Sequence, residues 1–373
     1  GRHRRDRGRM GDRGEWLRAQ GARRRCRSGP QVSRWWFPVL GAAGGIAYAI
    51  KKHRAVREVL PELRAPWLYL PTPVPPLLPW PAVNRGAARA GRRLMRRQTR
   101  VRNGVALERR VLDLTAGEVA LYLYEPPQRS RPSGALLWIH GGAQVAGHPE
   151  QDHDLCSMMA EDLQILVVSV DYRLAPEHLF PAAHEDCYAA LRWMHEHAAD
   201  MGIDPNRVAV AGASAGGGLA ATVAQHAHDE HLPVAVQVLV YPMLDDRSTL
   251  RADRGGRGRL SLTPALNRYA WTSYLGHHPT EADPGRYAAA ARRSNLRGLA
   301  PAWIGVGDLD LLHDDAVVYA HRLRAAGVRC ELHLESGMYH GADAGPTSTA
   351  ASMTAFRARI SAAIGSATAA QPC

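Results

Sequence analysis

The chain has 373 residues, of which 46% are hydrophobic, and a formal net charge of +12. A hydrophobic fraction of this size excludes a globally disordered chain, and the lack of any uncharged apolar run of about 20 residues excludes a multi-span membrane protein. Residues 1–100 carry 24 Lys and Arg but only 5 Asp and Glu, whereas the rest of the chain carries 23 and 30. The positive charge therefore belongs to the N-terminal segment, and the mildly acidic remainder argues against a groove for nucleic-acid phosphates.

The N-terminal segment divides into three parts. Residues 1–34 are rich in Arg and Gly without an apolar period, so we expect a basic, disordered leader. The uncharged stretch Trp35–Ile50 is too short to cross a hydrocarbon core of about 30 Å as a helix. Three interpretations are open: a packed cap, a membrane-associated anchor, or the apolar region of a signal segment. In a cap, an apolar acyl pocket would be covered by Trp35, Trp36, Phe37, Val39, Leu40, Ile46, Tyr48 and Ile50. We expect residues 35–100, with a proline-rich stretch at 61–84, to form a cap and wrapping segment.

The five cysteines are scattered and form neither a CxxC pair nor a Cys/His ligand spacing. The sequence therefore predicts no zinc site and no disulfide framework. This usage is typical of a reducing compartment, so we expect a cytoplasmic protein, with membrane association through residues 35–50 as the alternative.

From about residue 101, short β-like runs alternate with helical patterns. Val105–Leu114 and Val119–Tyr124 alternate in polarity around Ala116-Gly117, which predicts a hairpin. Buried strands are predicted by continuous apolar runs at Ala135–Ile139, Ile165–Val170, Val208–Ala211, Ala235–Val240, Ala302–Val306 and Cys330–Leu334. Helical patterns lie between them at Ala182–His197, Ala215–His228 and Asp314–Ala326. This alternation predicts an α/β fold with a mostly parallel sheet, helices on both faces, and a site at the carboxyl ends of the strands.

The third of these apolar runs ends in a candidate nucleophile. Val208–Ala211 leads into Gly212-Ala213-Ser214-Ala215-Gly216 and then into a helical pattern. This is GxSxG between a strand and a helix, where small residues permit the sharp turn that exposes a serine hydroxyl. The pattern favours Ser214 as a nucleophile, with the following helix N-terminus beside a developing oxyanion.

A candidate oxyanion loop follows the first of these runs. Ala135–Ile139 ends in His140-Gly141-Gly142-Ala143. Two glycines leave the backbone N–H groups open to a carbonyl oxygen, because no side chain blocks its approach. We expect Gly141 and Gly142, with the N–H of Ala215, to form an oxyanion hole.

The last two apolar runs supply an acid and a base. Ala302–Val306 leads into a loop with two candidate acids, Asp308 and Asp310, and Cys330–Leu334 leads into a loop with His340. His333 lies within the strand alternation and is expected to be structural. Along the chain the candidate residues follow the order serine, aspartate, histidine. Among serine hydrolases this order is typical of the α/β hydrolases and differs from the orders in the chymotrypsin and subtilisin folds.

The motifs resemble those of the hormone-sensitive-lipase-like (family IV) branch of the α/β hydrolases, which are mainly microbial carboxylesterases. The resemblance covers about residues 101–365 and is carried by His140-Gly141-Gly142-Ala143, Asp171-Tyr172-Arg173-Leu174-Ala175-Pro176-Glu177, Gly212–Gly217, Asp310–Asp315 and Gly337–Gly341. It implies an α/β-hydrolase fold with a helical cap and favours Asp310 over Asp308 as the acid. Ala143, Ala213 and Leu311 depart from the family pattern without removing a catalytic group. The resemblance divides the chain into the segments before residue 101 and a catalytic domain at 101–373, with a cap insertion near 245–290.

We therefore expect a serine carboxylesterase that hydrolyses small-molecule esters with short to medium acyl chains through Ser214, His340 and Asp310 and an acyl-enzyme intermediate. Tyr172, Arg173 and Glu177 are expected to brace the oxyanion loop. This chemistry needs no metal and no organic cofactor; we expect a monomer or homodimer and no nucleic-acid partner. The alternatives are an amidase or aryl-formamide hydrolase with the same triad, and a non-catalytic small-molecule receptor on the same fold.

Overall fold

The computed structural model describes residues 36–72, 85–86, 88–90, 92–93, 98–115 and 117–370, without the side chains of 36–44 and 46. The predicted leader at 1–34 lies outside the described residues. Two compact units are distinguished, Gly1–Ala47 and Tyr48–Cys373. In the first, residues 36–47 are helical and begin α1 (Trp36–Glu58). The second holds the sheet, and across the described ranges no helix has the length and apolarity to cross a membrane.

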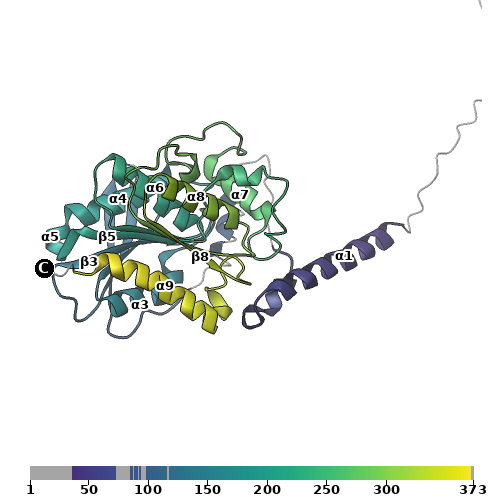
Figure 1. The fold of residues 1–373 in the computed structure, drawn as a ribbon, viewed down its shortest axis with the longest axis horizontal. Coiled ribbons are helices and arrows are strands. Elements are labelled where there is room, and N and C mark those ends of the chain that lie inside the picture. Colours follow the sequence, from purple (N-terminus) through teal and green to yellow (C-terminus); the bar gives the residue numbers. More distant parts are fainter. Residues whose placement is uncertain are drawn as a thin grey trace, which may run out of the picture. The chain divides into compact units, whose positions relative to one another are not determined.

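The described strands form one sheet in the order β1-β2-β4-β3-β5-β6-β7-β8 (Figure 1). The β1–β2 and β2–β4 pairs are antiparallel and the other pairs are parallel, which confirms the predicted α/β class. The strands are β1 (Ala106–Leu114), β2 (Gly117–Glu125), β3 (Ser133–Ile139), β4 (Leu166–Asp171), β5 (Ile203–Ala213), β6 (Val236–Val240), β7 (Ala302–Gly307) and β8 (Cys330–Glu335).

The strands follow the apolar pattern of the sequence closely. The predicted hairpin is confirmed, with Leu114 paired to Gly117 next to the turn. All seven residues of β3 are buried, as expected for a parallel strand with helices on both faces, whereas β1 at the sheet edge is largely exposed. Strand β5 differs from the prediction because it begins at Ile203, five residues before the apolar run at Val208.

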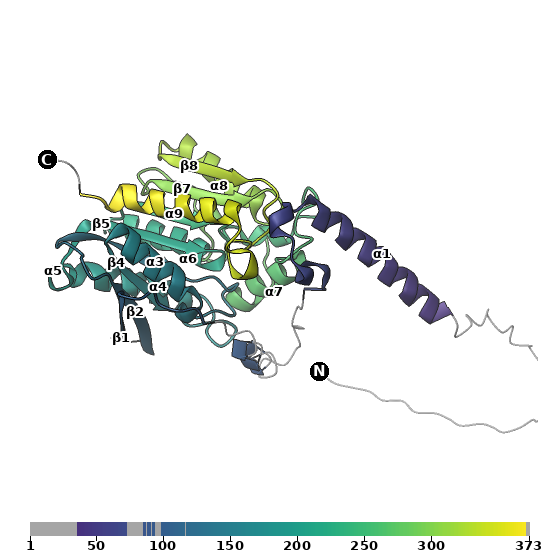
Figure 2. The same ribbon diagram turned by 90° about the horizontal axis from the view of Figure 1, so that it is seen from below.

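Helices cover both faces of the sheet (Figures 1 and 2). On one face lie α3 (His153–Leu163) and α9 (Ala351–Thr368), and on the other lie α4 (Ala182–Glu196), α6 (Ala215–Asp229) and α8 (His313–Ala325). The short helix α5 (Ala198–Met201) precedes β5. Between β6 and β7, the segment predicted as a cap insertion contains η4 (Asp246–Thr249), α7 (Pro264–Leu275) and η5 (Ala290–Arg292).

The end of α1 and the following 3-10 turns, η1 (Pro61–Leu63) and η2 (Pro66–Tyr69), belong to the hydrophobic core. The buried side chains here are Ala55, Val56, Val59, Leu63 and Leu68. Of the residues expected to cover a pocket, Tyr48 and Ile50 are the ones whose side chains the structure describes. They are 42% and 49% exposed, and the expectation is wrong for these two because neither lines the cavity at Ser214. Among the described side chains of α1, buried apolar residues begin at Ala55.

Candidate active site

Ser214 lies in a sharp turn between β5 and α6, in a left-handed backbone conformation with φ 57° and ψ −119°. Close approach of β3 explains the glycines on either side. A Cβ on Gly212 would lie 2.6 Å from the carbonyl oxygen of Ile139, and a Cβ on Gly216 would collide with the same oxygen. Glycines at these two positions are therefore required for the turn that carries the serine.

The turn also places the serine at the beginning of a helix. Ala215 is the first residue of α6, so its N–H has no acceptor within the helix. The carbonyl oxygen of Ser214 accepts hydrogen bonds from the N–H groups of Gly218 and Met243, both at 3.0 Å. These contacts hold the serine backbone fixed, and the helix dipole favours negative charge beside it.

The loop after β3 approaches the serine from the neighbouring strand. A Cβ on Gly141 would lie 3.5 Å from Cβ of Ser214, so the backbone of Gly141 passes directly beside the nucleophile. Gly142 has φ 136°, and its carbonyl accepts from the N–H groups of Val145 (3.1 Å) and Ala146 (2.9 Å). A Cβ on Gly142 would collide with the carbonyl oxygen of Ala146, so this tight turn excludes any other residue.

Residues that follow β4 hold the loop after β3 in its conformation. The ring of His140 is buried and stacks on Tyr172 with centroids 4.3 Å apart, and the Tyr172 hydroxyl donates to the His140 carbonyl at 2.9 Å. The N–H of Ala175 donates to the carbonyl of Gln144 at 2.9 Å. Burial lowers the pKa of His140 to about 4, so this ring is neutral and serves as a packing surface.

Of the three residues expected to brace the loop, Tyr172 contacts it directly. Arg173 pairs with the buried carboxylate of Asp186 at 2.7 Å. Glu177 accepts from Arg92, whose Nη1 donates to the carbonyl of Val145 at 2.8 Å. The sequence analysis missed Arg92, because no local pattern distinguishes it from its many Arg neighbours.

The predicted acid, base and nucleophile lie in one hydrogen-bonded row. His340 Nδ1 is 2.7 Å from Asp310 Oδ2, and His340 Nε2 is 2.8 Å from Ser214 Oγ. Asp310 is fully buried, and its Oδ1 accepts from the N–H of Leu312 at 2.9 Å. The other histidine of this region, His333, contacts Glu335 at 2.8 Å within β8.

Tyr241 is a neighbour of the base that the sequence analysis did not identify. Its ring meets the imidazole of His340 edge-on with centroids 4.8 Å apart. The Tyr241 hydroxyl donates to Oδ1 of Asp343 at 2.7 Å, and burial raises the pKa of the Asp343 carboxyl. The hydrogen bond fixes the tyrosine ring and so limits the orientations open to His340.

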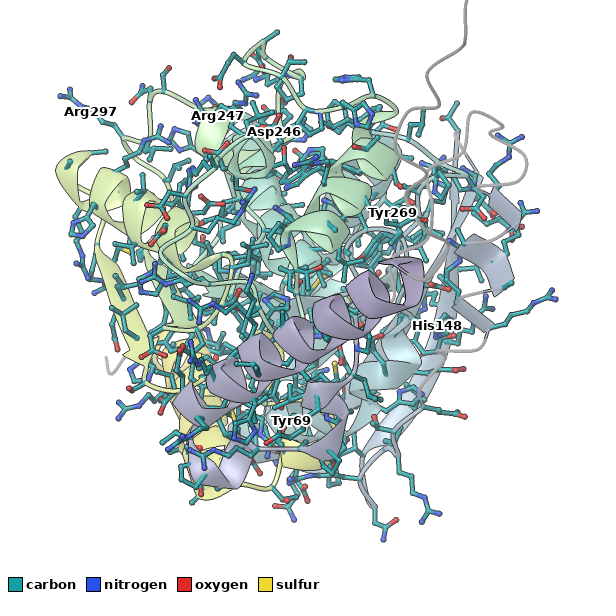
Figure 3. The ribbon with its side chains drawn as sticks, turned by 90° about the vertical axis from the view of Figure 1, so that its right-hand side faces the viewer. Tyr69, His148, Asp246, Arg247, Tyr269 and Arg297 are labelled. Carbon is teal, nitrogen blue, oxygen red and sulfur yellow. The ribbon has the colours of Figure 1, made fainter. Side chains whose placement is uncertain are left out.

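Above this row lies a cavity of about 610 Å³. Its floor includes Ser214, His340 and the loop glycines, and its walls are mainly apolar side chains of the N-terminal segment and of the segment between β6 and β7. Figure 3 labels Tyr269 on α7 and Tyr69 on η2, two elements that contribute to these walls. The wall residues include Trp67, Leu68, Leu70, Leu262, Leu266 and Tyr269. A reacting group at Ser214 would therefore meet an apolar environment.

Among the residues that the structure describes, no three or more His, Cys, Asp or Glu side chains are grouped so that they could hold a metal ion. The described cysteines, Cys156, Cys187 and Cys330, are buried thiols without disulfide partners. Burial raises the pKa of each thiol, which disfavours the reactive thiolate.

Comparison with known proteins places this arrangement in context. Residues 136–344 match a family described by the α/β hydrolase fold. Esterase LipI of Mycobacterium tuberculosis is 38% identical over 252 residues, which cover 64% of this chain and 77% of that protein. Carboxylesterase NlhH of the same species is 39% identical over 248 residues, which cover 63% of this chain and 76% of that protein. A solved bacterial heroin esterase has a TM-score of 0.72 at 34% identity and covers 84% of this chain and 99% of its own. The matched residues run from β3 to just beyond His340.

Proposed function

We propose a catalytic mechanism for this chain, which belongs to the hormone-sensitive-lipase-like family of α/β hydrolases and is a carboxylic ester hydrolase. In this proposal Ser214 is the nucleophile, His340 the general base and acid, and Asp310 the group that orients His340. The observation that carries it is the row of contacts from Asp310 through His340 to Ser214, at 2.7 and 2.8 Å.

Acylation begins with proton transfer within this row. The Asp310 carboxylate can only accept, so Nδ1 of His340 carries a hydrogen and Nε2 is left as an acceptor for the Ser214 hydroxyl. As Ser214 Oγ attacks the ester carbonyl carbon, its proton moves to Nε2 of His340. Asp310 then stabilises the imidazolium. Because Asp310 is fully buried, this charge interaction is little weakened by water.

The second requirement of the reaction is to stabilise the negative charge that develops on the carbonyl oxygen. We assign its stabilisation to the N–H groups of Gly141, Gly142 and Ala215, which come from two loops that meet at Ser214. Collapse of the tetrahedral intermediate breaks the bond to the alcohol oxygen, which takes the proton from Nε2 of His340. Water then attacks the acyl-enzyme, gives its proton to the same nitrogen, and the acid leaves as Ser214 regains its proton.

The cavity supports a preference for short to medium acyl chains. Its volume of about 610 Å³ lies within the range of small-molecule pockets, and its apolar walls favour an alkyl or aryl group beside the ester. In this proposal η2 and the segment around α7 act as a cap that closes the pocket over Ser214.

Hydrolysis of aryl esters from acetyl to palmitoyl tests the proposal. We expect kcat/KM to be highest among the short and medium chains, and Ser214→Ala to lower kcat by about 10⁴-fold or more. Ser366→Ala, at an exposed serine of α9, is the matched control and should retain full activity. Undiminished turnover by Ser214→Ala would remove the nucleophile from the proposal. A higher kcat/KM for N-formyl aryl amides in the same assay would replace esterase by amidase as the main activity.

A further inference from the structure

Lys52 is an unusual residue in the wall of the cavity. The chain has only two lysines, Lys51 and Lys52, adjacent on α1. Lys51 is exposed, whereas Lys52 is only 7% exposed and lines the same cavity as Ser214 and His340. A cationic side chain thus shares an otherwise mainly apolar pocket with the candidate triad.

Lys52 uses one of the three hydrogen-bond donors of its ammonium group in contacts with described residues. Its Nζ donates to the carbonyl oxygen of Arg259 at 2.9 Å. An ammonium has three N–H donors, and among the described residues no second acceptor contacts this one. No carboxylate of the described chain forms an ion pair with it either, and burial lowers the pKa of Lys52.

Two other charged side chains that line the cavity, Arg92 and Asp152, have partners. Arg92 is paired with Glu177 and also donates to the carbonyls of Val145 and Ala175. Asp152 accepts from Nε1 of Trp138 at 2.8 Å. Lys52 is therefore the cation in the described wall of the cavity whose charge is not balanced by a neighbouring carboxylate.

A buried charge without a counter-ion is costly, and an anion that enters the cavity removes part of that cost. We propose that Lys52 binds a carboxylate on the substrate, so that the preferred substrates are esters with a free carboxylate at the end remote from the scissile bond. Half-esters of dicarboxylic acids are the simplest members of this class. This inference rests on the proposed function only in placing the ester at Ser214.

The hydrogen bond from Lys52 to the carbonyl of Arg259 suggests an alternative, purely structural role, in which the lysine ties α1 to the loop before α7. Substitution of Lys52 has different consequences under the structural and the carboxylate-binding role. Loss of a tie would disturb the cavity for every substrate, whereas loss of a carboxylate-binding group would affect anionic substrates alone.

The test compares methyl half-esters of succinate, glutarate, adipate and suberate with the corresponding dimethyl diesters. Wild type should favour the half-ester at one or more chain lengths. In Lys52→Gln the ratio of half-ester to diester kcat/KM should fall by about 10-fold or more, while diester kcat/KM stays within about 2-fold, since hydrogen bonds to charged groups have effects of this size. Lys51→Gln, which alters the exposed neighbour, should behave as wild type.

A second measurement separates binding from turnover. The same half-esters are titrated into Ser214→Ala and into the Ser214→Ala, Lys52→Gln double variant, and we expect affinity for the half-ester to fall by about 10-fold in the double variant. An unchanged ratio and unchanged affinity, or an equal loss for half-esters and diesters, would overturn the role of Lys52. Hydrolysis that persists in Ser214→Ala would instead contradict the proposed mechanism, and the binding comparison would still decide the role of Lys52.

Discussion

Asp310 Oδ2 lies 2.7 Å from His340 Nδ1. Asp308, two residues earlier in the same loop, has a different partner, because its carboxylate accepts from the N–H of Gly337 at 2.8 Å. Both aspartates thus contact the loop that follows β8, but only one reaches the imidazole. Asp308 contributes to the shape of that loop, and Asp310 to the orientation of the base.

This difference predicts opposite results for two equivalent substitutions. Asp310→Asn should lower kcat by about 10²–10⁴-fold, since an amide no longer stabilises the imidazolium or selects the right tautomer of His340. Asp308→Asn should stay within about 3-fold of wild type, because the amide oxygen still accepts from Gly337. The measurement is kcat for an aryl ester, with circular dichroism to show that both variants fold. The reverse order of the two effects would show that Asp308 is the acid.

The turn at Gly142 allows a test of the oxyanion loop. Gly142→Ala places a Cβ against the carbonyl of Ala146 at φ 136°, so the loop must shift away from Ser214. We expect kcat to fall by about 10²-fold or more, the effect of losing an oxyanion donor. Steady-state kinetics on an ester with a good leaving group measures this loss.

The neighbouring Ala143 is the matched control. It has φ 57°, a conformation in which alanine is strained by about 1 kcal/mol and glycine is not. Ala143→Gly should therefore keep activity and change the free energy of unfolding by less than about 1 kcal/mol, since relief of strain offsets the greater freedom of the unfolded chain. If Gly142→Ala were as active as Ala143→Gly, the loop backbone would have no part in the reaction.

The sequence alone predicted the sheet and the position of the candidate site because both depend on local patterns. Continuous apolar runs mark strands that are buried on both faces, and β3, β4 and β6 begin within two residues of the predicted positions. Since Ser214, Asp310 and His340 lie in the turns and loops after β5, β7 and β8, a correct sheet brings them to one edge.

Local patterns in the sequence could not predict contacts between segments that are far apart along the chain. The start of β5 at Ile203 was missed because Asp204, Pro205 and Asn206 interrupt its apolar pattern. Lys52 contacts a carbonyl 207 residues away, and Arg92 contacts one 53 residues away, so no spacing in the sequence marks either residue. For the same reason the sequence did not identify Ala55 and Val56, near the end of α1, as residues of the hydrophobic core.

Buried histidines predict a loss of stability in acid. His184 on α4 is 2% exposed, with Nδ1 3.1 Å from Thr222 Oγ1 and Nε2 3.0 Å from His226 Nδ1. Burial, and secondarily the charge of a protonated His226, lowers the pKa of His184 to about 3 from 6.5. Between these values the unfolded chain binds a proton that the folded chain does not. The contribution to stability is therefore complete above pH 6.5 and decreases as the pH falls toward 3, with about 2 kcal/mol lost by pH 5.

Denaturant unfolding at pH 7.5, 6 and 5 measures this decrease. His184→Asn removes the titrating group, so the difference in unfolding free energy between the variant and wild type should shrink by about 2 kcal/mol from pH 7.5 to pH 5. His231→Asn, at an exposed position with φ 57° that suits asparagine, is the matched control for the same substitution outside the core. A parallel pH dependence of wild type and His184→Asn would exclude His184 as a source of acid lability.

The N-terminal segment predicts different outcomes for two truncations. A chain that starts at Tyr48 keeps the side chains of α1 that the structure describes as buried, which are Lys52, Ala55 and Val56, so it should match the full chain in stability and in acyl-chain preference. A chain that starts at Pro61 lacks Val56 and Val59, which are 0% and 1% exposed, and should lose about 3–6 kcal/mol of unfolding free energy from their burial alone. It also lacks Lys52, one of the residues that line the cavity, together with the buried apolar side chains of α1, and the loss of this packing should alter the order of kcat/KM along the aryl ester series. Denaturant unfolding and the aryl ester series are the two measurements.

Equal stability and an unchanged substrate order in the shorter chain would show that α1 has no part in the pocket, and a membrane anchor would then be the better account of Trp35–Ile50.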